Sequence, residues 1–146
     1  MLNGALGGLV AITAEPLMPT PLMAIIIGGI GGALVFAGTE LLTAMKIDDV
    51  VGAIPVHLIA GVWGTLAVPI TNPDTSFGTQ FLGTASICVF VFVVSIIIWS
   101  IMKATIGIRI SEEAEKEGTD VAETGVIAYS IRAVSYTHLR AHETSP

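Results

Sequence analysis

Four apolar segments, separated by short polar stretches, precede a polar C-terminal tail. The segments are residues 2–14, 22–45, 48–70 and 81–106. The last three each supply the roughly 20 residues that a membrane-spanning helix needs. The first is shorter, and we interpret it as the remnant of a longer helix. A lone strand in lipid would leave its backbone polar groups unsatisfied, so the pattern predicts helices throughout.

The basic residues indicate how these segments are oriented. The loops at residues 15–21 and 71–76 contain neither Lys nor Arg. Four basic residues lie at segment ends that share the opposite side if the segments cross alternately: Lys46, Lys103, Arg109 and Lys116. Because basic loops stay in the cytoplasm, we expect the C-terminus there.

The composition agrees with a membrane protein. Hydrophobic residues make up 53% of the 146 residues and charged residues 12%, with a mean hydropathy of +0.83. Soluble domains contain about 25% charged residues, so we predict an all-α integral membrane fold. The net charge of -6 has a local source, since five acidic residues fall within residues 112–120. The sequence has no basic cluster typical of nucleic-acid binding, and its single cysteine, Cys88, excludes an internal disulfide.

The third segment has one histidine inside its apolar run. His57 follows Asp48 and Asp49 by roughly 10–13 Å along a helix. An ionisable ring at this depth is costly and usually belongs to a substrate path or a proton relay. The alternative is a core histidine bonded to a backbone carbonyl, and the residues alone favour neither. Gly61 and Gly64 are expected on the same helix face, where they allow a close approach.

Other residues of the segments have structural and functional interpretations. Gly28 and Gly32 form a small-xxx-small pair, typical of closely packed membrane helices. Glu40 is either an intramembrane ligand for a proton or cation, or a carboxylate near the interface, and the nearby Lys46 favours the second. Trp63 is expected to pack against a helix or lipid rather than to form a substrate cage.

The chain becomes polar after the fourth segment, and we expect residues 107–134 to form a cytoplasmic tail. Ser111 can cap a short helix over residues 112–117, whose acidic residues complement the helix dipole, and Gly118 can end it. Residues 121–129 can add a second short element. The tail either contacts another protein or is solvated, and composition favours neither.

Residues 135–146 match neither a membrane segment nor the tail. His138, His142 and Glu143 superficially suggest zinc, but their order lacks the H-E-x-x-H arrangement and they lie at a chain end. We expect no metal site, and no nucleophile with a base that would make an enzyme. We interpret this stretch as non-native, from read-through or adaptor sequence, or as disordered.

Three phrases of the sequence resemble the ammonium transporters of the Amt/Mep/Rh group. They are NGALGGLVAITA at residues 3–14, KIDDVVGAIPVHLIAGVWGTLAV at 46–68 and GIRISEEAEKEGTDVAETGVIAY at 107–129, in the family's order. The resemblance implies eleven spanning helices in two inverted repeats, assembled as a homotrimer with one pore per subunit. Residues 1–106 correspond to part of the eighth helix through the eleventh.

His57 matches the family's tenth-helix pore histidine. In the family a second histidine, from the fifth helix, faces it across a narrow apolar pore. Ammonium carries a charge that a dry pore cannot solvate, and a pair of imidazoles can bind ammonia and relay a proton. The resemblance therefore implies transport of ammonium or ammonia, with methylammonium as an analogue and with no cofactor.

The residues around His57 both match the family and depart from it. Asp48 and Asp49 match its acidic pair, which either helps at the pore exit or caps the helix, and we favour capping. Leu58 replaces the family's usual glycine and points about 100° around the helix from His57. Pro55 is unusual here, and we expect it to remove a helix hydrogen bond and kink the segment.

The tail phrase resembles the family's cytoplasmic C-terminus, which contacts neighbouring subunits and, in many prokaryotic members, PII-type signal proteins. The matching regulatory positions are Ser111, Glu112, Glu113, Gly118 and Asp120. The resemblance implies a multi-pass protein of the inner cell membrane, surrounded by lipid. One alternative is an ammonium sensor on the same fold, which would carry a signalling domain after the tail. Another is an Rh-type gas channel, against which the SEEAEKEG tail argues.

Overall fold

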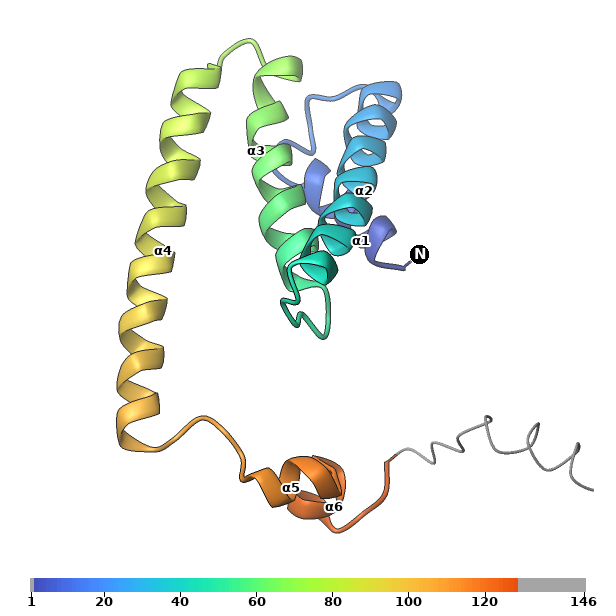
Figure 1. Ribbon diagram of the computed structural model, residues 1–146. Coiled ribbons are helices and arrows are strands. Elements are labelled where there is room, and N and C mark those ends of the chain that lie inside the picture. The colour runs from blue at the N-terminus through green and yellow to red at the C-terminus, as the bar shows by residue number, and fades with distance from the viewer. Residues whose placement is uncertain (1, 129–146) are drawn as a thin grey trace, which may run out of the picture. The chain divides into compact units, whose positions relative to one another are not determined.

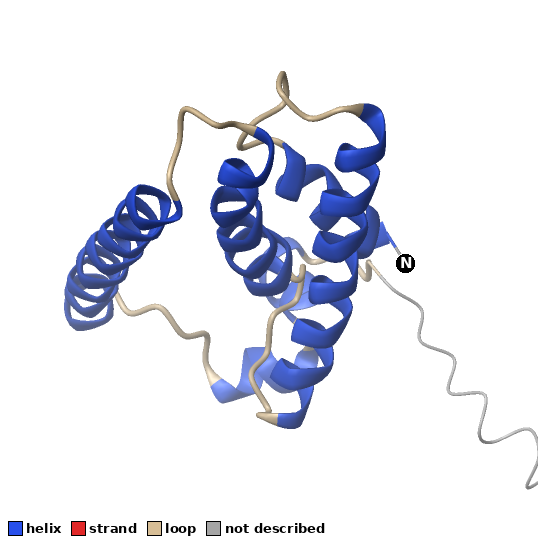
Figure 2. Ribbon diagram, turned by 90° about the horizontal axis from the view of Figure 1, so that it is seen from above, coloured by secondary structure: helices blue, strands red, loops and turns tan. Residues whose placement is uncertain are grey.

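The computed structural model describes residues 2–128 of the chain. Over this range it contains helices and loops and no strand (Figure 2). In chain order the helices are α1 (Leu2–Ile12), α2 (Pro21–Ala44), the π-helix η1 (Ile54–Ile59), α3 (Ala60–Thr71), α4 (Phe77–Thr105), α5 (Glu112–Glu117) and α6 (Thr119–Thr124) (Figure 1). Residues 135–146, with the zinc-like group His138, His142 and Glu143, lie outside the described residues.

All four apolar segments form helices, but the third helix begins later than predicted. We expected it to begin near Asp48, and it begins at Ile54. The residues between α2 and η1 form a turn, in which Lys46 and Gly52 have φ angles of 58° and 74°. Such left-handed values do not occur inside a regular α-helix. The turn therefore separates the aspartates from the helix that they were expected to open.

Glycine-to-glycine contacts join α1 to α2. A Cβ added at Gly32 would come within 2.9 Å of the Gly4 carbonyl oxygen, and one at Gly8 within 3.0 Å of the Gly28 carbonyl oxygen. These distances leave no room for a side chain, so the two backbones lie in direct contact. This is the geometry that small-xxx-small pairs provide between membrane helices.

The helices η1 and α3 pack against α1 and α2. Figure 1 shows α2 and α3 running in opposite directions beside each other. Two small apolar clusters form the core of this group: Ala11, Ile27 and Ala67 in one, and Val35, Val56 and Ala60 in the other. The indole N–H of Trp63 on α3 also donates to the Ile27 carbonyl oxygen on α2, at 3.0 Å. Trp63 thus has the packing role expected from the sequence.

Two side-chain hydrogen bonds join the ends of these helices. Asn3 Nδ2, at the start of α1, donates to the Val51 carbonyl oxygen before η1, at 3.1 Å. Asn72 Nδ2, after α3, donates to Glu15 Oε2, after α1, at 2.9 Å. Each bond connects segment ends that alternate crossing would bring to the same side. The contacts therefore agree with alternation of α1, α2 and η1–α3.

Three helical stretches are long and apolar enough to cross a membrane, judged by length and composition: α2, η1 continued by α3, and α4. None of the residues of α4 is buried, and most of the large hydrophobic side chains along it are exposed. An all-round apolar surface on a helix belongs in lipid or in a protein interior rather than in water. The described residues divide into two units, with the division between Ile97 and Ile98 inside α4.

Candidate functional site

The imidazole of His57 lies on the fourth residue of η1, among otherwise apolar residues. Its side chain is exposed, whereas its neighbours Pro55 and Val56 are buried. The core-histidine alternative requires a buried ring bonded to a carbonyl. Among the described residues no hydrogen bond from the His57 side chain is found, so this buried, bonded arrangement is not observed there.

The helix that carries His57 begins in π-helical rather than α-helical form. π-helical turns are rare and occur frequently at functional sites. Pro55 lies in the first turn of η1, where a backbone N–H has no intrahelical partner anyway. The expected loss of a helix hydrogen bond at Pro55 is therefore wrong, because the helix starts only one residue earlier.

Asp49 caps this helix from a position outside it. Its Oδ1 accepts the N–H of Ala53 and its Oδ2 accepts the N–H of Ile54, both at 2.8 Å. A carboxylate at a helix N-terminus bonds free N–H groups and complements the helix dipole. Asp48, beside it, is exposed to solvent. Of the two interpretations of the acidic pair, helix capping describes what the Asp49 carboxylate contacts.

Gly61 and Gly64 lie one and two turns after His57, on α3. A Cβ added at Gly64 would collide with the Ala11 carbonyl oxygen and lie 2.8 Å from the Ala11 Cα, whereas one at Gly61 would lie 3.8 Å from Val10 Cγ1. Gly64 is buried while His57 is exposed. The close approach predicted at these glycines is thus made at Gly64, by α1, and not at Gly61.

Two further side chains near this region are exposed. Leu58, the departure from the family pattern, is 50% exposed. Glu40 is exposed on α2, and within residues 2–128 it takes part in no ion pair with Lys46. The choice between an intramembrane ligand and a carboxylate near the interface therefore stays open, although pairing with Lys46 is not observed among the described residues.

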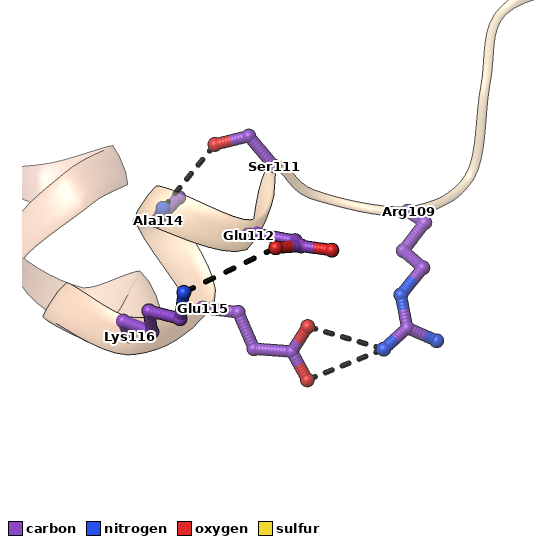
Figure 3. Close-up of polar contacts among 6 residues, drawn as sticks. All are labelled: Arg109, Ser111, Glu112, Ala114, Glu115 and Lys116. Carbon is purple, nitrogen blue, oxygen red and sulfur yellow. Dashed lines mark hydrogen bonds and ion pairs between the residues drawn. The ribbon is translucent and has the colours of Figure 1, made fainter.

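The polar tail after α4 forms its predicted helix, α5. Ser111 Oγ accepts the N–H of Ala114 at 3.2 Å, and Gly118, with φ 105°, ends the helix through its N–H bond to the Ala114 carbonyl oxygen. Glu113 is exposed, and Glu112 lies 4.0 Å from Lys116 Nζ (Figure 3). Exposed i,i+4 pairs of this kind contribute only about 0.3–0.5 kcal/mol.

The tail also contains two side-chain contacts that sequence analysis missed. Arg109 Nη2 donates to both carboxylate oxygens of Glu115, at 3.3 and 3.1 Å (Figure 3). Asp120 Oδ2 accepts the N–H of Ala128 at 2.8 Å, and this bond is the main cause that holds the pKa of Asp120 below its ordinary value. The six- and eight-residue separations do not follow a helical repeat, so periodicity gives no signal for either.

Comparison with known proteins assigns the chain to a family. The model of the Ammonium Transporter Family matches residues 1–129. The chain belongs to the ammonium transporter family. It is 35% identical over 134 residues to the ammonium transporter Amt1 of Haloferax mediterranei, covering 88% of this chain and 26% of that protein. It is 37% identical over 143 residues to the ammonium transporter of Bacillus subtilis, covering 87% of this chain and 35% of that protein.

A third relative gives the same coverage. The ammonium transporter Amt2 of Archaeoglobus fulgidus is 35% identical over 148 residues, covering 87% of this chain and 31% of that protein. The chain thus spans about a quarter to a third of the length of these relatives. The family model includes the whole stretch from α1 to α6 and therefore both His57 and the tail helices.

Proposed function

We propose that this chain is the C-terminal part of a protein that carries ammonium or ammonia across a membrane, and that His57 supplies one of two facing pore histidines. The observation that carries the proposal is the match of residues 1–129 to the ammonium transporter family, with an exposed imidazole on a spanning stretch. Transport by the named relatives supports ammonium as the substrate, with methylammonium as its analogue.

The chemistry of the imidazole suits this role. A charged ammonium ion is costly to bring into an apolar pore, so it must be bonded by the pore or give up a proton there. A neutral imidazole donates with one ring nitrogen and accepts with the other. His57 is exposed and has apolar residues on either side in sequence, so a facing ring supplied by the opposing repeat would complete a dry, hydrogen-bonding passage.

The assembly and the tail follow from the same proposal. We infer an inner-membrane protein, a homotrimer in its complete form, with residues 107–134 in the cytoplasm. The side of the basic residues supports this orientation. The tail helices, with Ser111, Glu112, Glu113, Gly118 and Asp120, form the surface that would contact a neighbouring subunit or a PII-type signal protein.

Uptake of labelled methylammonium by cells lacking their own ammonium transporters tests the proposal. Cells are given an empty vector, this chain alone, or the complete reading frame that contains it. We expect uptake from the complete protein and none above the empty vector from the chain alone, because the opposing repeat is missing. Uptake by the chain alone, or none by a complete protein that reaches the membrane, would contradict the proposal.

A further inference from the structure

The turn before η1 is held from two sides by side chains that lie far apart in the sequence. On one side, the two Asp49 oxygens accept the N–H groups of Ala53 and Ile54. On the other, Asn3 Nδ2 from α1 donates to the Val51 carbonyl oxygen at 3.1 Å. The turn therefore connects the first helix of the chain to the first turn of the histidine helix.

Gly52 is the residue on which both contacts converge. Its φ of 74° is a left-handed value that side chains disfavour, and the place of a Cβ on it is already filled by the Asn3 amide nitrogen. Its N–H donates to the Asp49 carbonyl oxygen at 3.1 Å, and its carbonyl oxygen accepts the N–H of Val56 at 3.0 Å. The geometry of this turn thus determines where the first helical hydrogen bonds of η1 form.

These contacts bear on His57 because it lies only three residues into η1. The neighbouring Val56 and Ala60 are fixed in the core, with 2% and 0% of their surface exposed, while the imidazole lies on the exposed side. A π-helix has a wider turn than an α-helix, so a change between the two at Ile54–Ile59 would rotate the ring about the helix axis. What fixes the start of η1 therefore also fixes the direction of the ring.

We propose that Asn3 and Asp49 are positioning residues for His57, acting through the turn and the π-helical start of its helix. The expected effect of these residues on transport rests on the proposed function. Their expected effect on the orientation of the His57 ring rests on the observed contacts alone. Neither side chain touches the imidazole or the transported species. An asparagine at position 49 would keep only one acceptor oxygen for two N–H groups, so the first turn would lose one charge-assisted bond.

The test uses the complete protein with Asp49→Asn, Asn3→Ala and the control Asp74→Asn, which removes one carboxylate from the loop after α3. Transport is measured as maximal rate and KM separately. Misplacement of a reacting group by about 1 Å can cost about a hundredfold in rate. We expect the maximal rate to fall by up to about this factor for Asp49→Asn, by less for Asn3→Ala and not for Asp74→Asn, with KM little changed.

A second readout follows the ring position without transport. In the complete protein, Cys88 and any other cysteine are replaced by serine and His57→Cys is introduced; its alkylation by a soluble maleimide is then measured alone and together with each of the three substitutions. We expect the alkylation rate to change with Asp49→Asn and Asn3→Ala, and to stay the same with Asp74→Asn. Asn3→Ala removes only one exposed bond, so we expect this variant to fold and to give a result even if Asp49→Asn does not.

The outcomes separate the two proposals. If the unsubstituted complete protein carries no ammonium, the proposed function fails, and the alkylation rates still decide the positioning. If it carries ammonium but both variants match it in maximal rate and in alkylation of position 57, the positioning proposal is overturned and the proposed function stands. A merely structural role predicts a lower yield of folded protein, with unchanged rate and alkylation per folded molecule.

Discussion

Substitution of Gly64 by alanine should loosen the docking of α3 on α1, although alanine is the better helix former. The added Cβ would collide with the Ala11 carbonyl oxygen and lie 2.8 Å from both the Ala11 carbonyl carbon and its Cα. These are backbone atoms, which cannot move aside by changing rotamer, so one helix must shift. Overpacking of this kind costs about 1–3 kcal/mol, whereas Gly→Ala inside a helix gains about 0.8–1.0 kcal/mol.

Gly61→Ala is the matched control on the same helix. Its Cβ would lie at an ordinary 3.8 Å from Val10 Cγ1. The Gly61→Ala variant therefore has the same gain in helix propensity as Gly64→Ala but not the collision. The difference in free energy of unfolding between the two variants therefore isolates the steric cost, about 1–3 kcal/mol. The sign is fixed by the structure: Gly64→Ala is the less stable variant.

Trp63 provides the assay. With Trp99→Phe it is the sole tryptophan of the chain, and its N–H bond to α2 makes its fluorescence a reporter of helix docking. The chain is unfolded reversibly with increasing SDS in mixed micelles, and the free energy is taken from the fluorescence transition. Equal stability of Gly64→Ala and Gly61→Ala, or greater stability of Gly64→Ala, would refute the reasoning.

Three further predictions concern hydrogen bonds. Trp63→Phe keeps an apolar ring but loses the hydrogen bond to α2, and should lower the free energy of unfolding by about 0.5–1.5 kcal/mol. The measurement is circular dichroism during SDS titration, and an unchanged free energy would mean that the bond contributes nothing. Ser111→Ala removes the cap of α5 and should destabilise that helix by about 1 kcal/mol, seen as a loss of helical carbon chemical shifts over Glu112–Glu117, while Ser111→Asp, which can still cap, should retain them. The pKa of Asp120 is lowered in the folded tail, mainly by its bond to the N–H of Ala128. This bond therefore stabilises the tail fully at pH values above the ordinary carboxyl pKa of 3.8. The stabilisation is lost as the pH falls through the lowered pKa. The amide shift of Ala128 should follow this titration and should not do so in Asp120→Asn.

Much of the fold could be predicted from residue pattern alone. Hydrophobic length indicated the apolar helices, the spacing of Gly28 and Gly32 indicated a close helix contact, and Ser111 with Gly118 indicated both ends of α5. These signals are local, since each depends on residues within a few positions of one another. The family resemblance added the assignment of His57, which its residue type alone left open.

The start of the third helix was mispredicted because an apolar run does not distinguish a turn from a helix end. Residues 50–54 read VVGAI and continue the hydrophobic pattern, yet Gly52 takes a left-handed conformation. That conformation is held by Asn3, 49 residues away along the chain. The local signal was a glycine, Gly52, three residues after Asp49, and it did not reveal the partner on α1.

The long-range polar contacts could not be predicted at all. The bonds from Asn3 to Val51 and from Asn72 to Glu15 connect residues 48 and 57 positions apart. Which polar side chains meet depends on how α1 packs against α3, and that packing depends on backbone contact at Gly64. Sequence pattern identifies a glycine but not the helix that will lie against it.

The most direct test of the central claim is the ammonium flux of the complete protein in proteoliposomes with and without the imidazole of His57. Wild-type protein and His57→Ala are reconstituted at equal amounts, and the initial rate is followed by the internal pH change on addition of ammonium. We predict that His57→Ala reduces the flux to that of protein-free liposomes or close to it. A flux equal to that of the wild type would contradict the assignment of His57 to the conduction path.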